Sequence, residues 1–348
     1  MHLLKKNDLP GEIEIHTDLL STLPSALSRK RALKAGREHQ AIMPDPGTAT
    51  CILCRPELKS VSSYPHEELI PDRVGHFEND FPYLSGDQRV IYLWHSELAK
   101  RTDGLHRVKL EDFGKSELYW LTKACVVLGK KYQAPDRTHD LMRMIVGFNL
   151  GRLAGQSIPH FHVQYGWEIV LDRRTITEKE LGLYFEELSH SELVLYENDR
   201  IKVVAPWTPK GQFALELYFN RKYEIVELDD WDLATLAIYG HRIVQKYLSL
   251  GIQNLNIVFA NSPKGRKTEP LVIHFVPRVN MTALYEIKGV NVVDTPPQKI
   301  AEEFRRHGGD EEPINWIDLY NQVQNFDADA TFDADLNRML QKANKSGT

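Results

Sequence analysis

Residues 149–164 read NLGRLAGQSIPHFHVQ, and their second half alternates polar and apolar side chains. The alternating residues are His160, Phe161, His162, Val163 and Gln164. Successive side chains of a β-strand point to opposite faces of the sheet. The pattern therefore predicts a strand with the two histidines and the glutamine on one face, and the two apolar residues toward the core.

The first half of the stretch predicts a turn rich in backbone donors. Gly151 and Gly155 stand there with Asn149, Gln156 and Ser157. A glycine-rich turn can bring backbone N–H groups close to an anion. A loop of this kind beside two imidazoles and an amide favours phosphate chemistry with a histidine nucleophile. The alternative is an ordinary strand with a polar, solvated face.

The composition indicates a soluble globular enzyme with room for two domain-sized units in its 348 residues. A net charge of -5 argues against a nucleic-acid partner. Residues 1–16 have no apolar stretch of the length typical of a secretion signal, and no run approaches the roughly 20 apolar residues that would span a membrane, so we expect neither element. Three cysteines cannot build a disulfide framework, and two of them form the motif Cys51-Ile52-Leu53-Cys54. We expect a cytoplasmic protein with no membrane partner.

Hydrophobic periodicity predicts an α+β fold. The expected strands cover residues 89–94, 143–148, 193–205, 213–219, 256–259 and 271–276, and the expected helices lie at 114–132, within 165–190 and from 228 to Gly251. Cys125 lies on the apolar stripe of the first helix, so we expect it in the core.

The two halves of the chain repeat the same order of signals with a period near 110 residues. Each half has an acidic helix start, a helix, a strand that ends at an asparagine, and a histidine thirteen positions later. The pairs are Asn149 with His162, and Asn261 with His274. Val272 then matches His160, so chemistry is assigned to the first copy and walls of the site to the second. Two unrelated α+β halves could also show this order by chance.

Four segments follow from these patterns. Residues 1–45 form a polar arm whose basic cluster includes Arg31. Residues 46–190 form the catalytic unit and 191–307 a second, degenerate unit. Residues 308–348 form an acidic tail that we expect to be peripheral.

The motif around His162 resembles the histidine triad superfamily, whose signature alternates histidines with apolar residues. Hydrolases of that superfamily have a third histidine where this chain has Gln164, so the stretch looks like the transferase branch. That branch includes galactose-1-phosphate uridylyltransferase and nucleotide phosphorylases that act on diadenosine tetraphosphate or nucleotide sugars. The resemblance covers roughly residues 50–305 and implies two tandem histidine-triad-like units, each an antiparallel half-barrel sheet with packed helices.

The resemblance implies a catalytic role for three residues. His162 would attack the α-phosphorus of a nucleotide and form a covalent nucleotidyl-histidine. A neutral ring nitrogen can do so without first losing a proton, while a backbone carbonyl holds the other nitrogen. Gln164 and Ser157 would donate hydrogen bonds to the phosphate oxygens as charge builds there.

Nucleotide and phosphate binding is carried over to six further residues: Asn149, Gly155, Gln156, Asn79, Asp80 and Arg31. A carboxylate at Asp80 could accept both ribose hydroxyls, although an Asx turn before a strand is an equal alternative. Arg31 could pair with a phosphate, or belong to a solvated basic helix.

The resemblance also implies a structural zinc ion bound by Cys51, Cys54, His160 and a fourth ligand. His106 suits the fourth place because Leu110 and an acidic residue follow it at the family's spacing, and His95 is the alternative. Cysteine and histidine in a closed tetrahedral set suit structural zinc. The cysteines could instead form a redox pair or be two buried thiols.

The predicted activity is nucleotidyl transfer from a nucleotide sugar or dinucleoside polyphosphate to a phosphate or sugar-phosphate acceptor, as in carbohydrate metabolism. A homodimer is expected on the resemblance alone. The alternatives are a histidine-triad hydrolase and a non-catalytic nucleotide-binding protein. Phe161 stands where uridylyltransferases have proline, and residues 280–290 do not match their hexose-contacting segment, so galactose specificity does not follow.

Overall fold

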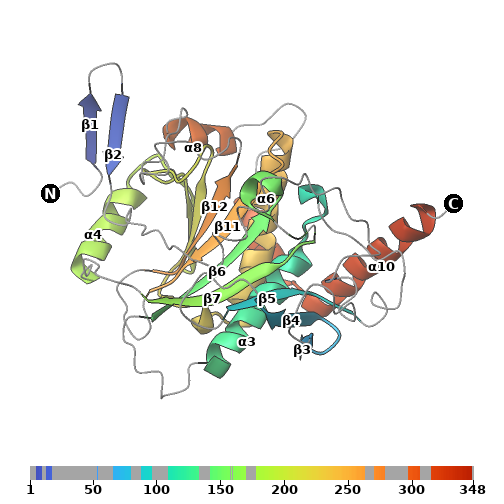
Figure 1. Cartoon of the computed structure of the whole chain (residues 1–348). Coiled ribbons are helices and arrows are strands. Elements are labelled where there is room, and N and C mark those ends of the chain that lie inside the picture. Colours follow the sequence, from blue (N-terminus) through green and yellow to red (C-terminus); the bar gives the residue numbers. More distant parts are fainter. Residues whose placement is uncertain are drawn as a thin grey trace, which may run out of the picture.

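A ten-stranded antiparallel sheet lies at the centre of the described part of the protein, as the computed structural model shows (Figure 1). The structure describes residues 5–9, 13–17, 53, 66–79, 88–95, 109–132, 142–156, 158, 160–169, 178–262, 270–278, 297–305 and 315–346. With helices packed on this sheet, the predicted α+β class is confirmed.

The sheet consists of two five-stranded sets with the same topology. The first set comprises β3 (Glu67–Ile70), β4 (Val74–Glu78), β5 (Gln88–Leu93), β6 (Met142–Leu150) and β7 (Val163–Ile169). The second comprises β8 (Val194–Glu197), β9 (Ile201–Val204), β10 (Leu215–Phe219), β11 (Leu255–Ala260) and β12 (Val272–Pro277). From the outer edge inward the orders are β3-β4-β5-β7-β6 and β8-β9-β10-β12-β11. Pairing of β6 with β11 joins the sets into one sheet.

The residue register of the predicted repeat is not kept in the sheet. In the first set the last residue pair of the β6–β7 ladder is Phe148 opposite Val163. If the ladder continued by one pair, Asn149 would lie opposite His162. In the second set His274 pairs with Val258, three residues before Asn261. The order of elements is therefore repeated, while the predicted equivalence of the two asparagines is wrong.

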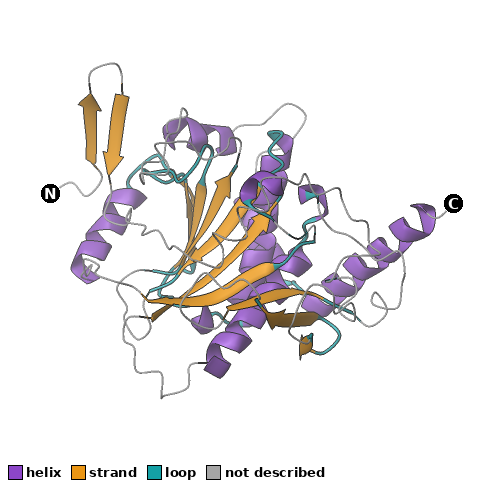
Figure 2. Cartoon of the chain, viewed as in Figure 1, coloured by secondary structure: helices purple, strands orange, loops and turns teal. Residues whose placement is uncertain are grey.

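Most helices cover one face of the sheet (Figure 2). They comprise α3 (Thr122–Tyr132), α5 (Asp230–Thr235), α6 (His241–Ser249), α8 (Pro297–Arg305), α9 (Trp316–Gln324), α10 (Ala328–Ser346) and the π-helical turns η3 (Glu117–Leu121) and η6 (Leu236–Gly240). Only α4 (Glu178–Ser189), among the described helices, packs on the other face, through Tyr184 and Leu188. Cys125 is fully buried under the first face, as predicted.

Strand β6 shows how the sequence divides these two faces. Met144, Val146, Phe148 and Leu150 are buried in the main core under the helices. The intervening residues turn to the other face because side chains alternate along a strand. That second face carries Asn149 and, opposite Gly147, Gln164 of β7.

The acidic tail is not peripheral, so this expectation is wrong. Its two helices, α9 and α10, bury Leu319, Val323, Phe332 and Leu336 in the main core. The pairs 319/323 and 332/336 are four residues apart, which puts each pair on one side of its helix. Acidic side chains dominate the composition of the tail, so its composition did not reveal this narrow apolar stripe.

Two smaller expectations also need correction. Within the arm, for which no strand was predicted, β1 (Lys5–Leu9) and β2 (Ile13–Thr17) pair as a hairpin. The single strand predicted over 193–205 is a hairpin of β8 and β9, where Asn198 Oδ1 accepts hydrogen bonds from the backbone N–H of Arg200 and Ile201.

Among the described helices, none combines the length and the apolar character that a membrane-spanning helix requires.

Candidate functional site

His160 and His162 lie just before a strand. Strand β7 begins at Val163, so the strand predicted through both histidines starts later than expected. The predicted core position of Phe161 and Val163 is confirmed nevertheless, because both are buried in the main core. The Phe161 ring meets Phe113 edge to face, with centroids 5.2 Å apart. This packing anchors the chain between the two histidines.

The His162 ring is oriented by a backbone carbonyl. Its Nδ1 lies 2.8 Å from the carbonyl oxygen of His160, in a buried position. Since a carbonyl oxygen can only accept, a neutral ring must carry its proton on Nδ1. The lone pair is then on Nε2, which is the arrangement that a nucleophilic imidazole needs.

The other predicted polar residues share the second face of the sheet. Gln164 pairs across the sheet with Gly147 on one side and Val90 on the other. Asn149, two residues after Gly147, lies on the same face beside Asn256 of β11. The first unit's motif therefore lies at the centre of the sheet, next to the seam between the two strand sets.

The glycine loop between β6 and His160 has the predicted tight turns. Gly151 has φ 86° and ψ 163°, and Gly155 has φ 85° and ψ 20°. Gln156 closes the loop, because its Oε1 accepts from Gly151 N at 2.7 Å and its Nε2 donates to the His160 carbonyl at 3.2 Å. The same carbonyl oxygen also accepts the hydrogen bond from His162 Nδ1. One atom, His160 O, therefore holds both the loop and the His162 ring.

The second unit holds this loop from across the seam. Asn254 Oδ1 accepts from Leu153 N at 3.0 Å, and Asn256 Nδ2 donates to the carbonyl oxygen of Ala154 at 2.8 Å. Sequence reasoning missed both asparagines. A signal was available, since Asn256 interrupts the apolar run 255–259 at a position that alternation places on the polar face.

Partly exposed residues occupy the middle of this face. They are Ile145, Gly147, Asn149, Gln164, Val258 and Ala260. A buried cluster of Leu53, Phe77, Val90 and Tyr92 lies on one side, and a second of Tyr184, Leu188, Leu193, Val204, Tyr218 and Val272 lies on the other. The strip between these clusters is therefore the accessible part of this face of the sheet. Because Gly147 has no side chain, the surface of the strip is lowest at that residue.

Only part of the predicted zinc set can be located. His160 is buried, and Leu53, which lies between the two cysteines, packs in the cluster against which Ile158 also packs. Cys51, Cys54 and His106 lie outside the described residues. Among the residues that are described, no group of three His, Cys, Asp or Glu could hold a metal ion. The alternative ligand His95 packs near the Phe332 ring, with centroids 6.0 Å apart.

The remaining predicted contacts are partly located as well. Asn79 follows β4 directly, and its backbone N–H donates to the Gln88 carbonyl at 2.9 Å. Asp80, Ser157 and Arg31 lie outside the described residues.

A buried charged network occupies the second unit on the same face. His274 Nδ1 lies 2.8 Å from Glu216 Oε1, and Lys210 Nζ lies 2.7 Å from His274 Nε2. The Tyr218 hydroxyl donates to the other oxygen of Glu216. Burial alone would raise the pKa of Glu216, but His274, Lys210 and this hydroxyl together lower it to about 2. His274 therefore has partners of its own, although the second copy lacks the His-x-His-x-Gln motif.

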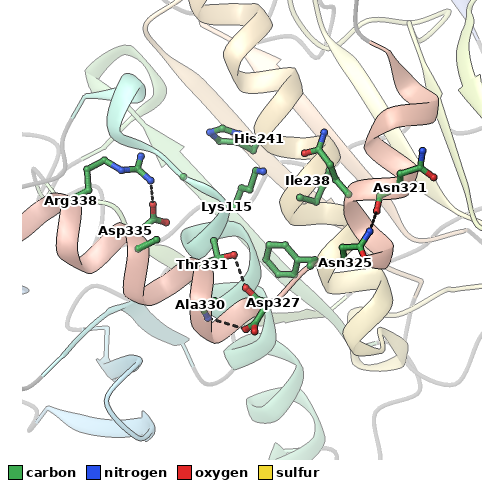
Figure 3. A pocket seen from close by; sticks show the side chains of 14 residues that line it. Lys115, Ile238, His241, Asn321, Asn325, Asp327, Ala330, Thr331, Asp335 and Arg338 are labelled. Atoms are coloured by element: carbon green, nitrogen blue, oxygen red, sulfur yellow. Dashed lines mark hydrogen bonds and ion pairs between the residues drawn. The ribbon is translucent and has the colours of Figure 1, made fainter.

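An open cavity of about 760 Å³ lies on the helix side of the sheet, between α10 and the core (Figure 3). Lys115 and His241 line it, together with Asp335 and Arg338. Burial, with the Lys115 ammonium nearby, lowers the pKa of His241 to about 4, so this ring is uncharged at neutral pH. None of the predicted site residues lines this cavity, and the sheet separates it from His162.

Comparison with solved structures places this fold among known ones. An ADP-glucose phosphorylase from Arabidopsis thaliana with bound ADP-glucose is similar at TM-score 0.58 and 18% identity, covering 79% of this chain and 94% of that one. A GALT-like protein from Arabidopsis thaliana is similar at TM-score 0.54 and 19% identity, covering 68% and 87%. A uridylyltransferase is similar at TM-score 0.53 and 14% identity, covering 92% and 99%.

Comparisons at the level of sequence find nothing: no protein-family model and no curated protein matches the chain. The structural likeness nevertheless extends over nearly the whole of each similar protein. The chain therefore shares the fold of these uridylyltransferase and phosphorylase structures, as the resemblance of the His-Phe-His-Val-Gln motif predicted.

Proposed function

We propose that the protein is a nucleotidyltransferase or nucleotide phosphorylase that acts through a covalent nucleotidyl-His162. The observation that supports this most directly is the 2.8 Å contact between His162 Nδ1 and the His160 carbonyl. It fixes the tautomer that carries the lone pair on Nε2, and it offers an acceptor for the Nδ1 proton when the ring becomes positively charged.

In the first step, Nε2 of His162 attacks the α-phosphorus of the donor nucleotide. A nitrogen–phosphorus bond forms, and the bond to the leaving phosphate oxygen breaks with its electron pair. The ring keeps its Nδ1 proton and becomes a positively charged nucleotidyl-imidazolium. No proton has to move, because the neutral ring is already nucleophilic at neutral pH.

In the second step, an oxygen of a phosphate or sugar-phosphate acceptor attacks the same phosphorus. The nitrogen–phosphorus bond breaks, and its electron pair returns to Nε2. Two displacements at one phosphorus give overall retention of configuration. Gln164 and Asn149, on the accessible strip, would donate hydrogen bonds to the phosphoryl oxygens in both steps.

The donor class is proposed from the similar fold. The similar ADP-glucose phosphorylase holds ADP-glucose, which is a nucleotide sugar. We propose the same class, or a dinucleoside polyphosphate, as the donor for this chain. Asn79 and Asp80 would hold the nucleoside, and the loop amides of Gly155 and Gln156, with Ser157, the phosphates.

A zinc ion would fit as a structural element beside this site. Two thiols and two imidazoles are a donor set that closed zinc sites prefer. Leu53, which lies between Cys51 and Cys54 in the sequence, is buried in the cluster against which Ile158 packs, two residues before His160, and this supports the proposal. The bound ion would tie His160 in place and thereby steady the carbonyl that orients His162.

The test is covalent trapping. Purified protein is incubated with a panel of labelled nucleotide sugars and dinucleoside polyphosphates and quenched in alkali, in which a phosphohistidine bond survives. We expect acid-labile label on the wild type, none on His162→Gly, and normal labelling of the exposed control His190→Gly. The proposal fails if no donor labels the wild type, or if His162→Gly is labelled equally.

The fate of the label then separates transfer from hydrolysis. Trapped intermediate is mixed with phosphate, with hexose phosphate or with water alone. Because Gln164 replaces the third histidine of the hydrolases, we expect fast discharge to a phosphate acceptor and slow discharge to water. Rapid discharge to water would favour the hydrolase alternative.

A further inference from the structure

Asn256, a residue of the second unit, connects three parts of the site through one buried amide. Its Nδ2 donates to Asn149 Oδ1 at 2.7 Å and to the Ala154 carbonyl at 2.8 Å. Its Oδ1 accepts from Arg278 Nε at 2.6 Å. Both hydrogens and the oxygen of this amide are therefore used, as expected for a buried polar group.

The partners of Asn256 dictate which way its amide points. A guanidinium can only donate and a carbonyl can only accept. Arg278 must therefore face the oxygen of Asn256, and Ala154 must face its nitrogen. The reverse orientation would set two donors together on one side and two acceptors together on the other.

This orientation is passed on to Asn149. Because Asn256 presents a donor, Asn149 must present its Oδ1 in return, and its own Nδ2 is directed away from Asn256. Among the residues that the structure describes, Asn149 Nδ2 has no hydrogen-bond partner. Asn149 is partly exposed on the strip beside Gln164, so this donor is available to a phosphoryl oxygen.

We propose that Asn256 and Arg278 are positioning residues of the second unit that hold Asn149 as a hydrogen-bond donor toward the substrate phosphate. Asn256 also holds the glycine loop at Ala154, so the same amide aligns the loop that leads to His162. The second unit thus contributes to the chemistry of the first unit by fixing which atom of the Asn149 amide donates a hydrogen bond and which accepts one. The inference rests on the proposed function, since it concerns the phosphoryl group that His162 would attack.

The direct test is Asn256→Asp, which keeps the shape and replaces the donor nitrogen by an oxygen. Asn149 is then expected to turn and donate to the new carboxylate, so that its own oxygen faces the phosphate. Loss of one preorganised donor to developing charge typically lowers a rate by about 10²–10³-fold. We expect a loss on the order of 10²-fold in the rate of nucleotidyl-His162 formation, measured in a single turnover.

A double-mutant comparison distinguishes positioning from simple structural damage. If Asn256 acts through Asn149, then Asn256→Asp will slow an Asn149→Ala protein much less than it slows the wild type. Fully additive losses would overturn the inference. Arg278 supplies a second route to the same result: Arg278→Met should slow the reaction, while Arg278→Lys, which still donates, should restore most of the rate.

Asn261→Asp is the matched control. Asn261 lies at the other end of the same seam and donates from Nδ2 to the Met144 carbonyl at 2.9 Å, so it joins the two units without touching the loop. We expect this variant to lose stability but to keep the labelling rate of its folded fraction. Labelling of Asn256→Asp at the wild-type rate would refute the inference alone, whereas an unlabelled wild type would refute the proposed function.

Discussion

A comparison of two glycines in one loop tests whether the loop geometry serves the chemistry. Gly151 and Gly155 both have φ near 85°. The proposed perturbation is to change each to alanine separately. The two variants add the same methyl group within one short segment, so any difference between them comes from local geometry.

The structure predicts different costs for the two variants. At Gly155 the backbone is left-handed, and no atom lies within 4 Å of an added Cβ. Alanine there costs about 1 kcal/mol of backbone energy. At Gly151 the combination of φ 86° and ψ 163° is tolerated almost only by glycine, at a cost of about 1–3 kcal/mol for other residues.

Gly151→Ala would also produce a steric clash. An added Cβ would lie 2.4 Å from Asn254 Oδ1 and 2.9 Å from the Gln253 carbonyl oxygen. Asn254 could swing aside only by releasing Leu153 N, which costs about 1 kcal/mol, and the Gln253 carbonyl is backbone. We therefore expect a total loss of about 3 kcal/mol for Gly151→Ala, against about 1 kcal/mol for Gly155→Ala.

The assay combines urea unfolding with the single-turnover rate of nucleotidyl-His162 formation. Displacing Gly151 displaces Gln156, which shares the His160 carbonyl with the His162 ring. We therefore expect Gly151→Ala to slow labelling at least tenfold in its folded fraction, a change of about 1.4 kcal/mol in barrier. Equal effects of the two variants on stability and rate would refute the reasoning.

Two further predictions concern the rest of the fold. The pKa of Glu216 is about 2, below its ordinary 4.5, so the stability it contributes is present above pH 4.5 and is lost as the pH falls toward 2. Acid titration of unfolding should show a loss on the order of 3 kcal/mol from this group over that range, and a loss smaller by about that amount in Glu216→Gln would confirm its source. Phe332→Ala should destabilise the protein by about 3–5 kcal/mol, because its buried ring packs under the Arg73 guanidinium, 4.4 Å from the ring centroid. The exposed Ile317→Ala on α9 should change stability by less than about 0.5 kcal/mol, and similar losses in both variants would contradict a core role for α10.

Local patterns predicted the elements well where periodicity was strong. The alternation around His162 identified Phe161 and Val163 as core residues, and the helical stripe through Cys125 identified a core helix. Prediction was weaker where tertiary contacts override local pattern. Strand β7 starts at Val163 because the preceding chain is held by Phe113 and by the glycine loop, neither of which periodicity can detect. The tail was misjudged because charge dominates its composition.

The sequence by itself determined the α+β class and the repeated order of elements, since these depend on the period of side chains along each segment. His162 became the candidate nucleophile through the resemblance of its motif to a known family. Only the tertiary structure decided how the two units meet. Pairing of β6 with β11 brings Asn256 and Arg278 to Asn149, residues more than 100 positions apart in the chain. Arg278 orients the Asn256 amide, and that amide in turn orients Asn149, through contacts between residues that are distant in the sequence. The part that the second unit plays could therefore be identified only in the folded protein.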